Sequence, residues 1–277
     1  MPLLSRMEVI RLKLETLGVP SLRELCVRMG LDRSGNSSDL IKKVLANNPS
    51  PQMVAQFIKD KYLAIISERQ NLITTGELKV ELEKVKEFSW GVVQGQLDAK
   101  IQAEFVRKYV RYDELIRNIK RELHDEVTSY VICTWYNHWT TVLIEEYISQ
   151  HRKVIPALKK VKGVDIFFDG QPFDLKTTYL PREYDYSQAI ANPKNLIVWL
   201  YENQGAQRFG ADNRLFVVLY DSQNPEDSWK LKRDFGLIEN KIDAFFDTER
   251  VSANDEIVFS FQRKTYTAIS KLLFIVK

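Results

Sequence analysis

The sequence predicts a mixed α/β fold, in which a central mixed sheet is flanked by helices and preceded by an all-helical region. Up to His151, apolar residues recur every three or four positions, which is the spacing of amphipathic helices. After His151 the pattern changes to short apolar runs separated by turn residues, which indicates strands. The later elements follow the order helix, hairpin, helix, strand, helix, strand, and this alternation suits one sheet with helices on its faces.

Four helices are expected at the start of the chain, over residues 7–17, 21–29, 39–46 and 51–69. Gly18 and Pro20 end the first of them, and Ser21 is the expected N-cap of the second. Longer helices are expected over 77–151, a stretch with almost no proline and little glycine. The expected division is a helical region, 1–75, and a second domain, 76–277, whose core lies over about 127–277.

The second domain is expected to begin its sheet with a hairpin. Residues 164–168 and 172–178 have strand character, and the Asp169-Gly170 pair between them is a hairpin turn signal. Residues 192–205 are expected to form a helix, although 196–201 is apolar enough for a strand. The remaining expected elements are a central apolar strand at 214–220, a helix over 227–242, and strands at 256–261 and 272–277.

Composition and charge are those of an ordinary globular protein. Of 277 residues, 44% are hydrophobic and 28% are charged, and the net charge of +3 alone says little about partners. No apolar run approaches ~18 residues, and residues 1–12 lack the apolar core of a signal peptide. We therefore expect a soluble cytoplasmic protein without a membrane partner, with Cys26 and Cys133 as buried free thiols.

One acid-x-Lys pattern stands apart from the others. The pattern occurs four times, but only Asp174-Leu175-Lys176 falls in the predicted hairpin. Strand residues two apart share a face, so Asp174 and Lys176 project together. The turn brings Asp165, on the partner strand, close to Asp174. The competing interpretation is that both aspartates are surface acids beside a turn, although charge is costly on a strand of otherwise apolar residues.

Two carboxyls and an ammonium that converge in this way suit metal-dependent phosphodiester hydrolysis. Mg²⁺ prefers oxygen ligands, and in proteins it typically binds one or two carboxylates and keeps several waters. The ion neutralises charge on the scissile phosphate and lowers the pKa of a bound water. A nearby lysine can orient the attacking water and stabilise the transition state. Because adjacent carboxylates repel each other without a cation, a bound metal is a physical expectation here.

The segments 163–168 and 173–178, with the turn between them, resemble the PD-(D/E)xK signature of type II restriction endonucleases. The residues that match this signature are Asp165 for the first acid, Asp174 for the second acid and Lys176 for the lysine. Val164 stands where the signature has proline, a departure that many members share. The resemblance covers roughly residues 127–220, with the specific motif confined to 165–176.

The resemblance implies a restriction-endonuclease-like fold and an endonuclease that needs Mg²⁺, or Mn²⁺ in its place, to cut double-stranded DNA. The family commonly carries another glutamate on the helix before the hairpin, for which Glu145 fits best and Glu146 is the alternative. Asp165, Asp174 and Glu145 would then hold the metal, and Lys176 would position or activate the water. For a restriction enzyme, the candidate partners are a second copy of the chain and a DNA methyltransferase that acts on the same site.

Residues 21–46 resemble a SAP motif, a helix, extended loop and helix that binds duplex DNA. The resemblance implies phosphate contacts from the basic residues of this unit, which are Arg23, Arg28, Arg33, Lys42 and Lys43. An ordinary helical hairpin with an apolar core explains the same pattern equally well. Elsewhere, the candidates for DNA contact are Arg182, Gln204, Gln207, Arg208 and Arg214.

Two other functions fit the same residues. A repair or recombination nuclease with this core would cut according to DNA structure, whereas a restriction enzyme would give discrete plasmid fragments. A non-catalytic DNA-binding protein would use the SAP-like unit as its active part, and metal-dependent cleavage would exclude it.

Overall fold

The computed structural model describes residues 3–89, 99–203, 212–261 and 263–277. The chain forms two compact units, one of residues 1–72 with 145–277 and the other of residues 73–144. The N-terminal helices therefore belong to the same unit as the sheet, whereas the sequence predicted a boundary near residue 75. Within the described ranges, no helix combines the length and the apolar character needed to span a bilayer.

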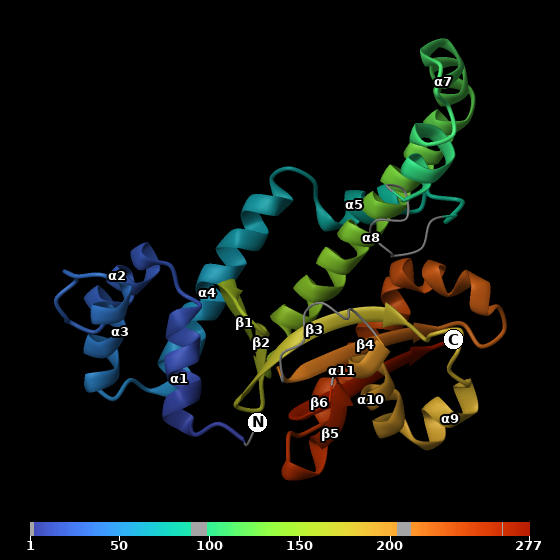
Figure 1. Cartoon of the computed structure of the whole chain (residues 1–277). Helices are drawn as coiled ribbons and strands as arrows, with labels where there is room; N and C mark the ends of the chain where they lie inside the picture. Colours follow the sequence, from blue (N-terminus) through green and yellow to red (C-terminus); the bar gives the residue numbers. More distant parts are fainter. Residues whose placement is uncertain (1–2, 90–98, 204–211, 262) are drawn as a thin grey trace. The chain divides into compact units, whose positions relative to one another are not determined.

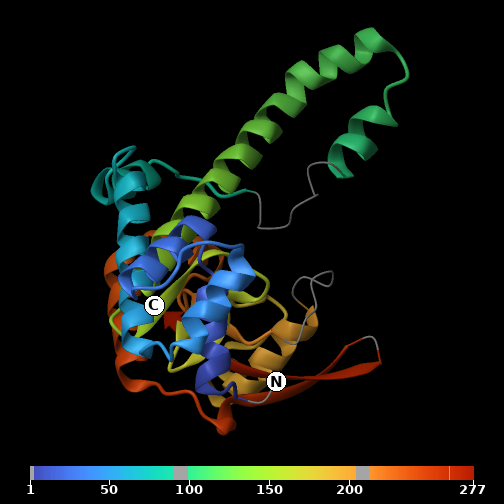
Figure 2. The same cartoon turned by 90° about the vertical axis from the view of Figure 1, so that its left-hand side faces the viewer.

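The first unit is built on a six-stranded mixed sheet in the order β1-β2-β3-β4-β6-β5. Its strands are β1 (Val154–Val161), β2 (Val164–Phe168), β3 (Gln171–Tyr179), β4 (Arg214–Tyr220), β5 (Glu256–Phe261) and β6 (Lys264–Val276). The β1-β2-β3 and β5-β6 pairs are antiparallel, and β4 runs parallel to both of its neighbours, β3 and β6. Figure 1 shows these central strands side by side, and Figure 2 shows β5 and β6, in red, as one long hairpin. The prediction of a mixed sheet with 214–220 as a central strand is confirmed.

Helices cover both faces of this sheet. On one face, Leu196 and Leu200 of α10 (Pro193–Asn203) pack in one cluster with Phe216 and Val218 of β4. Successive strand residues point to opposite faces, so the equally buried Val217 faces the other side. There α11 (Phe235–Thr248) packs against β6, and Phe246 meets the Phe168 ring edge-on at 4.9 Å between centroids. A helix rather than a strand at 192–205 is thereby confirmed for the residues up to 203.

The N-terminal helices are α1 (Arg6–Glu15), α2 (Val19–Arg28), α3 (Ser37–Ala46) and α4 (Pro51–Gln70). The four predicted helices are confirmed, but α2 and α3 each begin two residues earlier than predicted. Gly18, not the predicted Ser21, is the N-cap of α2, and Pro20 occupies its first turn. The four helices share a buried cluster, and α1 also packs on β2 through Val9, which contacts Val164 and Phe167. The Leu4 backbone N–H donates to Gln171 Oε1 at 2.8 Å, which fixes the start of the chain to β3.

The described part of the second unit is mostly helical, but only α8 is a long helix of the kind predicted for 77–151. It contains α5 (Thr75–Leu82), π-helical η1 (Ile101–Val106), α7 (Tyr112–Asn118), π-helical η2 (Ile119–Leu123) and the first part of α8 (His124–Gln150). Cys133 on α8 and Cys26 on α2 are buried free thiols, as predicted. The end of α8 belongs to the first unit and carries Glu145 into it.

Three elements differ from the sequence-based prediction. Strand β1 was not predicted, because Pro156 and the polar residues around it hide its alternation, and a register shift interrupts its pairing with β2. The helix predicted over 227–242 is wrong: a 3-10 helix, η3 (Pro225–Arg233), ends at Asp234, and Asp234 then caps α11. Strand β6 is more than twice as long as predicted. The short elements α9 (Tyr186–Ala191) and η4 (Ala253–Asp255) complete the chain.

Candidate active site

The β2-β3 hairpin sets the position of the two candidate aspartates. Its turn is Asp169-Gly170, and both residues have positive φ (+47° and +75°), as a two-residue hairpin turn requires. The turn fixes the register, in which Ile166 lies opposite Phe173 and Phe168 opposite Gln171. Continued by one residue, this register places Asp165 opposite Asp174. The hairpin predicted from the sequence is therefore present, and it brings the two aspartates together.

The carboxyl groups of Asp165 and Asp174 lie close enough to interact electrostatically. Asp165 Oδ2 accepts a hydrogen bond from the Leu175 backbone N–H at 2.8 Å. Asp165 is exposed as a residue, yet its carboxyl is partly desolvated by these contacts. Desolvation raises the pKa of Asp165, the charge of Asp174 raises it further, and the Leu175 N–H opposes the shift. The two carboxyls thus share a site in which full ionisation of both is unfavourable.

Two cations contact Asp174 from neighbouring positions on the sheet. Lys176 Nζ donates to Asp174 Oδ1 at 2.8 Å, and Arg214 Nε lies 3.3 Å from Oδ2. Arg214 is opposite Asp174 in the parallel β3-β4 pair, and its guanidinium lies 4.7 Å from the centre of the Tyr201 ring. The side chain of Lys176 is 45% exposed and that of Arg214 only 8%. Lys176 can therefore reach a ligand in solvent, whereas Arg214 is committed to holding Asp174.

Glu145, near the end of α8, is the third carboxyl of the site. Burial, and next the charge of Asp165, raise the pKa of Glu145 from 4.5 to about 7, while Lys176 and Lys232 oppose the rise. The adjacent Glu146 is instead ion-paired with Arg69 of α4, with both side chains nearly buried. Of the two glutamates that the sequence left as alternatives, Glu145 is the one whose pKa the two aspartates raise.

Lys232 is a member of the site that the sequence analysis missed. It lies on η3, is only 2% exposed, and interacts electrostatically with Glu145. In the sequence it is one of three closely spaced basic residues in a stretch that reads as the polar start of a helix. Only the 3-10 geometry of η3, packed against β4, turns this lysine inward, so no sequence pattern distinguished it.

A pocket of about 250 Å³ adjoins the carboxyls. Glu145, Asp165 and Leu175 line one side of it, and Tyr62 of α4 and the irregular stretch 156–159 of β1 line the rest. Burial raises the pKa of Tyr62 to about 12, and the nearby Ser149 opposes this rise. Glu145 and Asp165 are therefore accessible from a cavity that a small part of a substrate can enter.

The donor set fits a hard divalent cation. Asp165, Asp174 and Glu145 supply carboxylate oxygens, which are the ligands that Mg²⁺ prefers, and a cation would relieve the repulsion that raises the pKa of two of them. Among the described residues, no three acidic, histidine or cysteine side chains are already arranged as a complete metal-binding group. Asp174 is held by Lys176 and Arg214, so these three carboxyls would need to reorient to share one ion.

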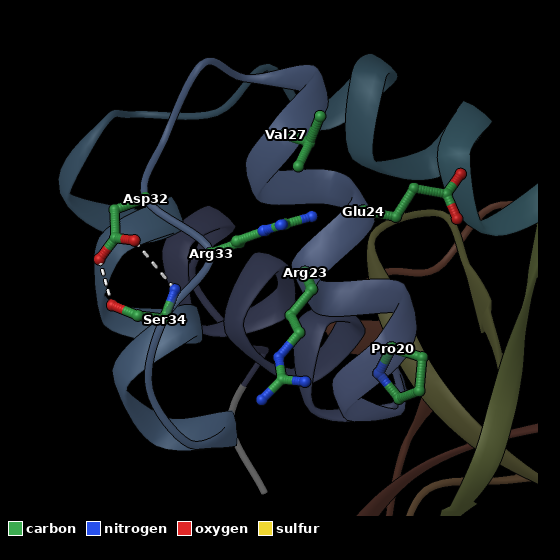
Figure 3. Close-up of a pocket in the computed structure, with 7 residues that line it drawn as sticks. All are labelled: Pro20, Arg23, Glu24, Val27, Asp32, Arg33 and Ser34. Atoms are coloured by element: carbon green, nitrogen blue, oxygen red, sulfur yellow. Dashed lines mark hydrogen bonds between the residues drawn. The ribbon is translucent and has the colours of Figure 1, made fainter.

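The SAP-like unit forms a second, separate feature of the surface. Figure 3 shows a pocket of about 730 Å³ between α2 and the loop before α3, with Arg23 and Arg33 among its lining residues. Lys43 spans this loop, since its ammonium donates to Asp32 at 2.6 Å and to the Ser34 carbonyl at 2.8 Å. Within the described part of the chain, Arg23, Arg33 and the exposed Lys42 form no ion pair. Lys43 therefore orders the loop, and the other three cations remain accessible to an anion.

The three arginines predicted elsewhere as DNA contacts have different outcomes. The prediction that Arg214 contacts DNA is wrong, because Arg214 is buried and ion-paired with Asp174. Arg182 is accessible, since its side chain is 82% exposed in an ion pair with Glu226. Arg208 lies outside the described residues, as do Gln204 and Gln207.

A comparison with protein families finds no match for this chain, and comparisons with curated proteins and with solved structures find none either.

The pKa of Glu145 leads to a first prediction, Glu145→Gln. The pKa of Glu145 is about 7 in the folded state and about 4.5 in the unfolded state. Such a carboxyl contributes fully to stability below pH 4.5, and this contribution is lost as the pH rises through about 7. In chelator, the variant should be more stable than wild type near pH 8 by about 3 kcal/mol, because the pKa rises from 4.5 to about 7 and each pKa unit corresponds to ~1.36 kcal/mol. Near pH 5 the free energies of unfolding of the variant and the wild type should differ much less. Urea unfolding at both pH values measures this, and a pH-independent difference would contradict it.

A second prediction concerns Arg214→Gln, which removes the buried partner of Asp174. Breaking a buried ion pair leaves one charge uncompensated, so the free energy of unfolding should fall by about 3 kcal/mol. The matched control is Arg182→Gln, whose exposed pair with Glu226 should contribute under about 1 kcal/mol. Equal stability of the two variants in urea unfolding would mean that Arg214 is not what holds Asp174.

Proposed function

We propose that this protein is a Mg²⁺-dependent endonuclease that hydrolyses phosphodiester bonds in double-stranded DNA. The observation that carries the proposal is the contact of Asp165, Asp174 and Lys176 on adjacent strands, with Glu145 acting on them from α8. Three carboxyls and a solvent-accessible lysine beside a pocket are the groups that such hydrolysis needs. The mixed sheet with helices on both faces also suits the proposed restriction-endonuclease-like fold.

Each residue has a distinct role in this proposal. Asp165 and Asp174 would hold the ion, with Glu145 assisting, and a bound Mg²⁺ would supply charge neutralisation and a more acidic water. The Lys176 side chain carries no oxygen and, as an ammonium, cannot ligate Mg²⁺, so it would orient the attacking water or stabilise charge on the phosphate. Arg214 is buried and ion-paired with Asp174, so in this proposal it holds Asp174 in place. Mn²⁺ also prefers oxygen ligands and can replace Mg²⁺ in this proposal.

A type II restriction enzyme is the form of this activity that we propose. Its partners would be a second copy of the chain and a methyltransferase that modifies the same DNA site. Accessible Arg23, Arg33 and Lys42 on the SAP-like unit support a DNA-binding role for the N-terminal helices. A cytoplasmic location suits this function and the two free cysteines.

Cleavage of a plasmid panel tests the proposal. Discrete fragments with Mg²⁺, and none in EDTA, would support a restriction enzyme, whereas cutting that follows branches or ends would support a repair nuclease. Binding without cleavage under Mg²⁺ and Mn²⁺ would leave only a DNA-binding protein and end the proposal.

A third prediction separates the metal ligands from the lysine. Lys176→Ala should keep metal and DNA affinity and lose at least about a hundredfold in single-turnover rate, the scale of removing one transition-state contact. Asp165→Ala should lose metal affinity as well, measured by calorimetric titration with DNA bound. The matched control is Glu183→Gln, an exposed acid just after β3, which should cut at the wild-type rate. Equal loss of metal affinity in the first two variants would show that Lys176 only holds the site together.

A fourth prediction concerns the SAP-like unit. Deletion of residues 1–48 would also remove α1, which packs on β2, and would expose the sheet, so substitutions are the cleaner test. The double variant Arg23→Gln/Arg33→Gln should weaken DNA binding and reduce the slope of log affinity against log salt by about 2, one for each lost phosphate contact. The control is Arg11→Gln on α1, whose ion pair is with Glu15. An unchanged slope in a folded double variant would show that the pocket does not meet DNA.

A further inference from the structure

Strand β1 departs from regular strand geometry where it passes the candidate active site. Its pairing with β2 is regular up to Pro156 and resumes only at Val161. Between these two points, the four residues 157–160 of β1 lie opposite a single residue of β2, Asp165. A bulge usually inserts one extra residue, and bulges beside active sites change the direction of a side chain. The irregular stretch of β1 is therefore a candidate part of the site.

This irregularity brings consecutive residues of β1 to one cavity. In a regular strand, neighbouring side chains point to opposite faces of the sheet. Here the four consecutive residues 156–159 all line the pocket of about 250 Å³ at the candidate active site. Leu158 packs against the core of the N-terminal helices, and Ala157 packs against the cluster between α1 and β2. These contacts anchor the stretch and hold Lys159, its last residue, at the pocket.

Lys159 supplies a positive charge to the wall of this pocket. Of the described residues that line the pocket, Lys159 is the only cation. It is exposed, and within the described ranges its ammonium has no hydrogen bond or ion pair. Lys176, by contrast, donates to Asp174 at 2.8 Å. An exposed lysine is ordinarily a solvated surface charge, but the broken register of β1 directs this one to a cavity, where its charge is available to an anionic group.

A phosphate of the DNA backbone is the anion that suits this position. Pockets that hold a whole drug-sized ligand have volumes of about 300–1,000 Å³, so a smaller cavity suits one group of a larger ligand. Each nucleotide of duplex DNA presents one phosphate, and lysine binds phosphate as a point charge. The pocket therefore matches a single phosphate of a long strand better than a free small molecule.

We propose that Lys159 is a substrate-binding residue, whose ammonium contacts the DNA phosphate that enters the pocket beside Glu145 and Asp165. This inference rests on the proposed function. Lys159 and Lys176 then contact the substrate from two different strands, β1 and β3. The recognisable motif lies wholly in β2 and β3, and only the broken register of β1 brings Lys159 to the site.

The test measures the affinity for a labelled DNA duplex of mixed sequence over a range of salt concentrations. Ca²⁺, which also takes oxygen ligands, replaces Mg²⁺. Lys159→Gln should weaken binding and reduce the slope of log affinity against log salt by about 1, the value for one lost phosphate contact. Lys159→Arg should keep the wild-type slope because it keeps the charge. The matched control is Lys162→Gln, at an exposed lysine of the next turn that does not line the pocket, and it should leave the slope unchanged.

Single-turnover cleavage with Mg²⁺ gives a second readout. Lys159→Gln should lower kcat/KM by about tenfold or more, the scale of one lost hydrogen bond to a charged group, and Lys162→Gln should cut at the wild-type rate. An unchanged salt slope for Lys159→Gln, or an equal reduction for Lys162→Gln, would overturn the proposal. If the wild type binds DNA but does not cut it, the proposed nuclease fails by itself, and the salt slopes still decide whether Lys159 contacts a phosphate.

Discussion

The contact between the Asp165 and Asp174 carboxyls is the constraint around which the rest of the site is arranged. The hairpin places these two acids opposite each other because its two-residue turn allows one register. A shift by one residue would turn the strands' apolar side chains away from the core, so the acids cannot separate by slipping. Their repulsion must therefore be balanced by other parts of the chain.

The balance comes from cations on three different elements. Lys176 belongs to the same strand as Asp174, Arg214 comes from the neighbouring parallel strand, and Lys232 acts on the third carboxyl from η3. Two of these three cations, Arg214 and Lys232, are buried, and burying a charged group destabilises a fold. Stability alone therefore does not explain their positions. Titratable groups concentrated beside a pocket, with shifted pKa values, are typical of functional sites rather than of structural cores.

The local parts of this arrangement could be predicted from the sequence, and the long-range parts could not. The Asp169-Gly170 turn and the alternation of Ile166 and Phe168 define a hairpin with residues that lie side by side in the chain. Arg214 instead meets Asp174 through a parallel pairing across about forty residues, which no local pattern encodes. Arg214 therefore looked like a free surface arginine. Strand β1 escaped prediction because Pro156 and a register shift interrupt its alternation.

The choice between Glu145 and Glu146 shows why the N-terminal helices are part of the site. Both glutamates lie at the end of α8, and helical spacing alone directs them to different sides. Arg69 of α4 binds Glu146, which fixes the rotation of α8 about its axis and leaves Glu145 toward the hairpin. The same helix α4 contributes Tyr62 to the pocket beside Glu145. Helix α4, which packs in one cluster with the SAP-like helices α2 and α3, therefore also orients the third carboxyl. The N-terminal helices thus contribute both the accessible arginines and part of the geometry of the acidic site.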